Sequence, residues 1–261
     1  MHTQTRLPRK LPDHAPALAM AGVVIAILFF ERRRPARKLS RPLARRIGRN
    51  IALGALSMGA AGLLESPLAR RLARSVVKGR SGLVQQIPLP HWARDLLAVA
   101  AMDYTIYLWH VATHRIPFLW RFHLVHHLDR ELDSTTALRF HFAEIIVSVP
   151  YRLLQVRVIG TSERALLLWQ RLFFMSVLFH HSNLRLPDTL ERRLELLLTT
   201  PRMHRIHHSD EVQDTNSNWS SGLSIWDRLH GTLRARAPDD SIRIGAPNLR
   251  VEDGNYRYRR H

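Results

Sequence analysis

Apolar runs alternate with basic segments along the N-terminal part of the chain. One run extends from Ala15 to Phe30, a second from Ile51 to Leu64, and the arginine-rich stretch 32–49 lies between them. Because Glu31 and a run of arginines follow the first run instead of a small-residue cleavage site, we interpret it as a retained membrane helix rather than a signal peptide. The two runs predict a helical hairpin with its basic turn in the cytoplasm, since cytoplasmic loops are enriched in Lys and Arg.

Three further apolar runs follow, at residues 96–109, 145–159 and 165–179. The segment Ser66–Arg94 mixes arginines with leucines and valines, so we expect it to lie along a membrane surface. Arg152 and Arg157 interrupt the run 145–159, which indicates a partly interfacial or re-entrant segment. Beyond about residue 184 the chain is polar. Counting crossings from the basic turn, we expect an all-α, multi-pass membrane helical bundle whose cytosolic face carries a helical cap.

The net charge is +18, from 39 Lys and Arg against 21 Asp and Glu. These basic residues lie mainly between the apolar runs, where cytoplasmic loops meet anionic headgroups, so we expect no nucleic acid as a partner. The chain has no cysteine, which excludes disulfides, iron–sulfur clusters and thiolate zinc sites. Any metal must therefore be bound by histidine and carboxylate side chains.

Histidine is frequent, with 16 residues in 261, and eight of them fall into three short clusters. The clusters are His110 and His114; His123, His126 and His127; and His204, His207 and His208. Residues three or four positions apart share one face of a helix, so each cluster can direct its imidazoles to one place. The His-x-x-His-His spacing occurs twice, which a histidine-rich surface that meets phosphates does not explain. The crossings place all three clusters on the cytoplasmic side, so we expect a histidine-rich di-metal site in the cap.

A further pair, His180 and His181, can add a ninth nitrogen ligand from one of its two members. Nine nitrogens would nearly fill two metal sites and leave a position open for oxygen. Imidazole binds Fe, Zn, Cu and Ni alike, so the spacing does not identify the metal. We expect two iron ions with O₂ as co-substrate, because a lipid-embedded site with many neutral ligands suits oxygen activation better than hydrolysis. A zinc-dependent lipid hydrolase and a non-enzymatic metal-binding membrane protein remain the alternatives.

Residues from about 95 to about 235 resemble the fatty acid hydroxylase/sterol desaturase family of membrane proteins. The three clusters are similar to that family's histidine boxes in order and in separation. Its other motifs are matched by Arg139-Phe140-His141 with Glu144, by His181-Ser182-Asn183, by Asn218-Trp219 and by the segment 226–232. Phe142 stands where proline is common and His230 where phenylalanine is usual, which is consistent with a distinct branch.

The resemblance implies an oxidoreductase that hydroxylates, or desaturates, a lipid such as a fatty acyl chain or a sterol. It implies a di-iron centre under a cytosolic cap, in a multi-pass protein that we place in a bacterial inner membrane with its site facing the cytoplasm. The expected division is a membrane hairpin with an amphipathic connector (1–94), a catalytic domain (95–235) and a polar C-terminal tail (236–261). Electrons would come from a separate ferredoxin- or cytochrome-like protein, because the sequence has no flavin-type glycine fingerprint and no cysteine.

The resemblance also suggests roles for residues around the ligands. Glu144 and Arg139 are expected to orient ligands or brace the cap, and no catalytic residue separate from the metal ligands is expected. Trp226 and Asp227 are expected to hold the C-terminal turn. Imidazole tautomers must be fixed by hydrogen-bonding partners, for which the acidic candidates are Asp103, Asp129, Glu144 and Asp210. The role of His141 stays open.

Overall fold

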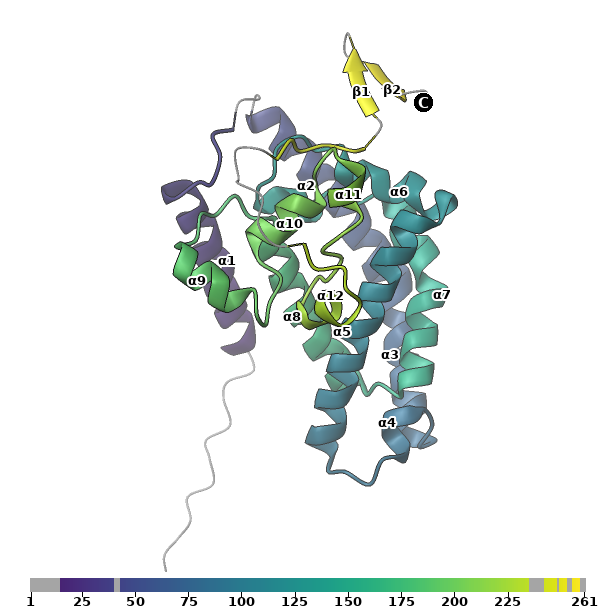
Figure 1. Cartoon of the computed structure of the whole chain (residues 1–261). Helices are drawn as coiled ribbons and strands as arrows, with labels where there is room; N and C mark the ends of the chain where they lie inside the picture. Colours follow the sequence, from purple (N-terminus) through teal and green to yellow (C-terminus); the bar gives the residue numbers. More distant parts are fainter. Residues whose placement is uncertain (1–14, 40–42, 235–241, 248, 253–254, 259–261) are drawn as a thin grey trace, which may run out of the picture.

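The structure, a computed structural model, describes residues 15–39, 43–234, 242–247, 249–252 and 255–258. These residues are mainly helical, as expected (Figure 1). The helices are α1 (Ala15–Arg33), α2 (Leu43–Ala60), the π-helix η1 (Ala61–Glu65), α3 (Ser66–Lys78), α4 (Leu83–Gln86), α5 (His91–Arg115), α6 (Pro117–His127), the 3-10 helix η2 (Ser134–Leu138), α7 (Phe142–Ile159), α8 (Glu163–His181), α9 (Asp188–Leu194), α10 (Pro201–His207), α11 (Val212–Thr215) and α12 (Ile225–Leu229). One antiparallel hairpin, β1 (Leu249–Glu252) with β2 (Asn255–Tyr258), lies within the expected polar tail 236–261. Parts of that tail, and residues 1–14 of the expected N-terminal unit, lie outside the described residues.

Two helices among the described residues are long and apolar enough to cross a membrane, Leu43–Gln86 and His91–Arg115. The first joins α2, η1, α3 and α4, so it includes most of the segment that we expected on a membrane surface. In α3, Ala69 and Ala73 are fully buried, and the helix packs against α7 and α8. The small residues of α3 recur at helical spacing and form the face that contacts α7 and α8, while Arg74 and the other arginines lie on the exposed face.

The runs at 145–159 and 165–179 form α7 and α8, two continuous helices. The segment expected to be partly interfacial or re-entrant forms the continuous helix α7, which contains Pro150. Its two arginines differ, because Arg152 is buried inside the bundle whereas Arg157 is exposed.

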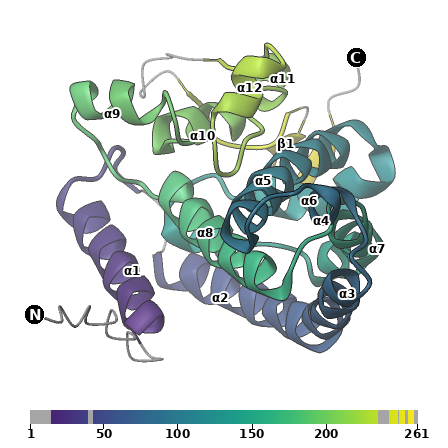
Figure 2. The same ribbon diagram turned by 90° about the horizontal axis from the view of Figure 1, so that it is seen from below.

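The helical bundle is formed by α2 with α3, α5, α7 and α8, which pack on one another. Its core includes Met102 of α5 and Leu166 and Trp169 of α8, all essentially buried. The two N-terminal helices contact different elements, because α1 packs on α8 whereas α2 packs on α7 and η2. Figure 2 accordingly shows α1 on the side of α8 away from α3 and α7.

Short helices cover one end of the bundle, where α5 and α8 both finish. Figure 1 shows α6, α10 and α11 at this end, while the connection from α4 to α5 lies at the other end. Asp103 joins α5 to the segment before and within α12, since its Oδ2 accepts hydrogen bonds from Leu223 N at 3.0 Å and Trp226 Nε1 at 2.7 Å. The short helices that follow α5 and α8 in the sequence therefore cover the end of the bundle where the predicted ligands lie.

Candidate metal centre

Nine histidine side chains form two neighbouring groups under these short helices. The first histidine group contains His110, His114, His123, His127 and His207. The second histidine group contains His126, His181, His204 and His208. Within each group the candidate ligand atoms all lie within 4.8 Å of one another. The groups are in contact, because the rings of His127 and His208 stack with their centroids 4.3 Å apart.

Four helices supply these side chains, and the sequence spacing explains how they are divided. The last turns of α5 carry His110 and His114, and the last turn of α8 carries His181. On α6, positions 123 and 127 belong to the first group and position 126 to the second. Around the end of α10, position 207 belongs to the first group, and positions 204 and 208 belong to the second. The repeated triplet therefore places imidazoles in both groups from a single helix face.

In the first histidine group, hydrogen bonds fix which ring nitrogen is free. His110 Nδ1 lies 2.7 Å from the carbonyl oxygen of Trp219, and His207 Nδ1 lies 2.9 Å from that of Ser217. A carbonyl can only accept, so each Nδ1 carries the proton and each Nε2 keeps a free lone pair. The Nε2 atoms of His123 and His207 are buried and have no hydrogen-bond partner among the described residues. These orphaned acceptors are suited to a metal ion.

In the second histidine group the Nε2 atoms point at one another. His181 Nε2 lies 2.9 Å from both His126 Nε2 and His204 Nε2, and His208 Nε2 lies 3.1 Å from His204 Nε2. His181 donates through Nδ1 to the carbonyl oxygen of Val177 at 2.7 Å, so its Nε2 carries a lone pair and no proton. His126 Nδ1 lies 3.3 Å from the carbonyl oxygen of Arg139, so the Nε2 lone pairs of His126 and His181 face each other, as expected where a cation binds between them.

Burial keeps four imidazoles of the cap neutral, those of His127, His204, His207 and His208. Desolvation holds the pKa of His127, His204 and His208 well below the usual value, and neighbouring histidines lower it further. Burial likewise lowers the pKa of His207 to about 3. Neutral imidazole is the metal-binding form, so no proton has to be displaced from these side chains at neutral pH.

His180 and His141 lie outside the two groups. His180 is buried, and its ring contacts that of His204 in a tilted arrangement with centroids 4.0 Å apart. His141 caps α7, where its Nδ1 accepts a hydrogen bond from Ala143 N at 3.1 Å. Of the adjacent pair at the end of α8, the geometry thus brings His181 and not His180 among the converging nitrogens.

Of the four acidic residues expected to fix imidazole tautomers, Glu144 contacts a predicted ligand. Its Oε1 lies 2.9 Å from His123 Nδ1, and both side chains are buried. Asp103 holds α12, and Asp210 lies 3.5 Å from the exposed Arg243. Asp129 belongs to a separate polar network.

That network joins α2 to the segment after α6. Asp129 Oδ2 accepts hydrogen bonds from Arg46 Nη1 at 2.9 Å and from Asn50 Nδ2 at 3.0 Å. Asn50 Oδ1 in turn accepts from Arg139 Nη1 at 3.1 Å, and the Arg139 carbonyl oxygen lies 3.3 Å from His126 Nδ1. Arg46 and Asn50 were not predicted as part of the site, because they lie in or next to the basic stretch attributed to headgroup contact. The backbone carbonyls of residues 177, 217 and 219 could not be predicted as partners, because every residue has a carbonyl and its position depends on the fold.

The closing motif is structural, as the resemblance implied. Asp227 is fully buried, and its two carboxylate oxygens accept from Trp219 N at 3.0 Å and Ser220 N at 2.9 Å. Thr232 Oγ1 also donates to Asp227 at 2.7 Å. This fixes the backbone of Trp219, whose carbonyl oxygen positions His110.

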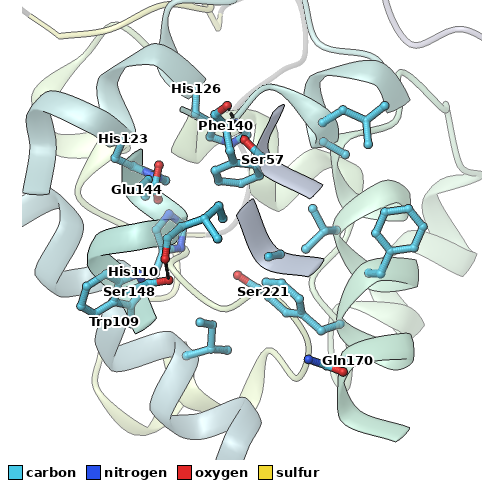
Figure 3. A pocket seen from close by; sticks show the side chains of 18 of the residues that line it. Ser57, Trp109, His110, His123, His126, Phe140, Glu144, Ser148, Gln170 and Ser221 are labelled. Carbon is cyan, nitrogen blue, oxygen red and sulfur yellow. Dashed lines mark hydrogen bonds and ion pairs between the residues drawn. The ribbon is translucent and has the colours of Figure 1, made fainter. Parts of the chain in front are cut away.

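A cavity of about 280 Å³ opens beside the histidines and extends into the bundle. Its histidine end includes His110, His123 and His126 (Figure 3). The walls are mostly apolar, with side chains such as Ile106 and Phe173 from α5 and α8. A hydrocarbon chain fits such a lining, whereas a soluble polar metabolite does not.

A sequence model of the fatty acid hydroxylase family matches residues 96–232. The chain is 29% identical over 150 residues to the ornithine lipid hydroxylase OlsE of Rhizobium tropici, an alignment that covers 58% of this chain and 44% of the relative. It is 30% identical over 138 residues to an alkylglycerol monooxygenase of Caenorhabditis elegans, covering 53% and 26% of the two chains. It is 24% identical over 149 residues to the cholesterol 25-hydroxylase of Mus musculus, covering 56% and 49%. The chain thus matches less than half the length of each of these relatives, and no solved structure matches it.

Proposed function

Because this chain belongs to the fatty acid hydroxylase family, we propose that it is a membrane-bound oxygenase that inserts oxygen into, or desaturates, the hydrocarbon part of a lipid. The observation that carries this proposal is the pair of histidine groups beside an apolar cavity. The similar proteins named above are hydroxylases and monooxygenases of an ornithine lipid, alkylglycerols and cholesterol, which supports a lipid as the substrate.

We assign one iron ion to each histidine group, with His181 as the ninth ligand. Structural zinc sites are four-coordinate and closed, whereas the first group offers five nitrogens and adjoins a second group. The buried nitrogens without partners and the converging Nε2 atoms fit metal ions. Iron bound there would supply the activation of O₂ and the oxidation of a C–H bond.

The residues of the chain contribute position and environment. Glu144 and the carbonyl oxygens of Trp219 and Ser217 hold three imidazoles in the tautomer that exposes Nε2. The cavity aligns a hydrocarbon segment beside the histidines and keeps bulk water away from it.

The placement in the cell follows from the same reasoning. We place the protein in a bacterial inner membrane as a multi-pass bundle, residues 95–235 forming the catalytic domain, with the histidine end and its cap in the cytoplasm. Exposed arginines at this end, Arg45, Arg49, Arg115 and Arg121, support contact with anionic headgroups or with an acidic electron-transfer protein. A ferredoxin- or cytochrome-like donor is proposed, because the chain has no cysteine for an iron–sulfur cluster of its own.

The proposal is tested by lipid profiling of cells with and without the gene, together with metal analysis of the purified protein. We expect lipid products heavier by one oxygen atom or lighter by two hydrogens, and about two irons per chain. A single zinc per chain with released fatty acids would support the hydrolase alternative. Loosely bound metal without any lipid product would support a non-enzymatic metal-binding protein.

A further inference from the structure

The cavity beside the histidines has a second polar region, formed by an ion pair. Arg152 of α7 and Glu65 of η1 both line the cavity, and Arg152 Nε lies 3.1 Å from Glu65 Oε1. Both residues are buried, at 7% and 8% exposure. Neither contacts a histidine of the two groups by any hydrogen bond found in the described residues, so the metal centre does not account for them.

Burying charged side chains in this position costs free energy. Glu65 lies near the middle of Leu43–Gln86, a helix apolar and long enough to cross a membrane. Charged side chains within membrane helices are rare, face the bundle interior, and typically mark sites that handle a substrate or an ion. Glu65 also ends the π-helical segment η1, and single π turns within helices are frequent at functional sites.

The pair lies deep in the cavity, away from the histidine end. Glu144, Ser148 and Arg152 recur every four residues on α7, and all three line the cavity. Glu144 contacts His123, so eight residues of helix separate the histidine end from Arg152, a rise of about 12 Å. Figure 3 shows His126 and His123 toward one end of the pocket and Gln170, whose chain neighbour Trp169 contacts Arg152, toward the other.

Other side chains hold Arg152 in place. Its guanidinium carbon lies 4.4 Å from the centroid of the Trp169 ring, a cation–π contact, and it donates to Gln155 Oε1. Gln155 Nε2 donates in turn to Thr105 Oγ1 of α5 at 2.6 Å. The guanidinium is therefore fixed from three helices, as expected for a binding group that is ordered before its ligand arrives.

The charges of the pair define what can bind beside it. An anionic group would be repelled by Glu65 and a cationic group by Arg152, so a charged partner gains little. A neutral group that both donates and accepts hydrogen bonds can satisfy the carboxylate and the guanidinium together. Hydroxyl and amide groups have this property. A bare hydrocarbon beside the ion pair would desolvate it without forming hydrogen bonds, which costs free energy.

We propose that Glu65 and Arg152 form a specificity site that binds a neutral hydroxyl or amide group of the lipid. The hydrocarbon about 12 Å from that group then lies at the histidine end, so the ion pair selects the substrate and sets which carbon is presented. This inference rests on the proposed function for its choice of a lipid, but the binding it describes does not require turnover.

The first test is binding of labelled long-chain compounds to the purified full-length protein in detergent. The probes are a primary alcohol, the alkane of the same length and the corresponding fatty acid. We expect the alcohol to bind at least about tenfold more tightly than either of the others, since hydrogen bonds to charged groups are the stronger ones. Equal affinity for alcohol and alkane in the wild-type protein would overturn the proposal.

The matched variants are the double substitution Glu65→Met with Arg152→Met, and Arg157→Met as a control on the exposed face of α7. Removing both charges avoids leaving one of them buried alone, which protects folding. We expect the double variant to lose the preference for the alcohol and the control to keep it. A folded double variant that retains the preference would contradict the assignment.

A second measurement needs no variant. An alcohol with a photoreactive diazirine next to its hydroxyl should crosslink to the wild-type protein around Arg152 or Trp169, and not at the histidine end. Crosslinks elsewhere, in a protein that does oxidise lipids, would refute this inference and leave the proposed function intact. Crosslinks at the pair, in an iron-loaded protein that oxidises no lipid, would refute the proposed function and keep the binding site.

Discussion

At the scale of single residues, the hydrogen bond that each imidazole makes through Nδ1 matters as much as the Nε2 atom that would bind the metal. His110 and His207 are held through Nδ1 by backbone carbonyl oxygens, and His123 by the Glu144 carboxylate. Because the partners are fixed by the fold, the free Nε2 atoms are aimed before any metal binds. Loss of a ligand and loss of its partner should therefore differ in degree.

Substituting a ligand should abolish activity without unfolding the protein. In His207→Ala the first histidine group loses a buried nitrogen that has no other partner among the described residues. We expect loss of lipid oxidation and of bound iron, with membrane insertion unchanged, measured by product analysis, metal analysis and membrane fractionation. The control is His91→Ala, at the exposed start of α5, which should behave as wild type. An active His207→Ala enzyme would remove this residue from the ligand set.

Substituting a partner of a ligand should weaken metal binding in a graded way. In Glu144→Gln an oxygen can still accept from His123 Nδ1, but the negative charge is lost. We expect iron affinity to fall about 10-fold, and nearer 100-fold for Glu144→Ala, as for other partners of ligating histidines. Iron titration of the purified variants measures this, and the control is Glu163→Gln at the start of α8, a half-buried glutamate paired with the exposed Arg74. Wild-type affinity in Glu144→Ala would show that the contact is incidental.

The sequence predicted the three histidine clusters but left open whether His180 or His181 joins them. Adjacent residues on a helix point about 100° apart, so the choice depends on how α8 is rotated in the bundle. That rotation is set by packing of side chains such as Leu166 and Trp169, which have distant partners. The clusters were predictable because each one depends on local spacing alone.

At the scale of elements, α2 shows how a polar helix face can be buried. Its buried positions are Arg46, Asn50, Gly54 and Ser57, which recur at helical spacing. Small and polar residues at such spacing are typical of helix contacts within membranes. This stripe was visible in the sequence, but the density of surrounding arginines led to a prediction of headgroup contact for the whole stretch 32–49.

Breaking the α2 network should destabilise the cap. Arg46 pairs with Asp129 at 2.9 Å and with Asp133, and all three side chains are buried. Arg46→Met leaves two carboxylates without this cation, which we expect to lower stability by about 3–5 kcal/mol. Thermal unfolding in detergent measures the loss, with Arg49→Met on the exposed face of the same helix as control. Equal melting temperatures for the two variants would show that the network is dispensable.

At the opposite end of the bundle, two glycines allow two turns to touch. Gly82 and Gly160 both have positive φ, 88° and 85°. A Cβ added to Gly82 would lie 2.4 Å from Gly160 Cα, so backbone would have to move. We expect Gly82→Ala to lower stability by about 1–3 kcal/mol, whereas Gly79→Ala, whose added Cβ would meet nothing nearer than 3.4 Å, should change it little. Unfolding experiments on both variants check this, and an unaffected Gly82→Ala would mean that the turns separate easily.

At the scale of the whole molecule, the path of the chain explains why distant histidines meet. The long helix Leu43–Gln86 leads away from the capped end, α5 returns to it, and α7 and α8 repeat the excursion. Both returning helices end in ligand candidates, and α6 and α10 lie across those ends. The order of the apolar runs predicted this shared end, because it requires only that successive helices alternate in direction. The lateral order of the helices depends on long-range packing and was not predictable.

The same arrangement predicts that metal and fold are linked. Nine imidazoles from α5, α6, α8 and α10 are packed together, and in the second group neighbouring Nε2 atoms lie 2.9–3.1 Å apart. Between His126 and His181, whose Nδ1 atoms both face backbone carbonyls, two Nε2 lone pairs lie 2.9 Å apart and repel each other without a cation, so removing the metal should loosen the cap first. We expect an iron chelator to lower the melting temperature and to expose α6 and α10 to hydrogen exchange, with recovery when Fe²⁺ is returned. In His207→Ala the shift caused by the chelator should be smaller, because less metal is bound at the start. Unchanged melting and exchange after complete removal of the metal would show that the histidine groups are held by packing alone.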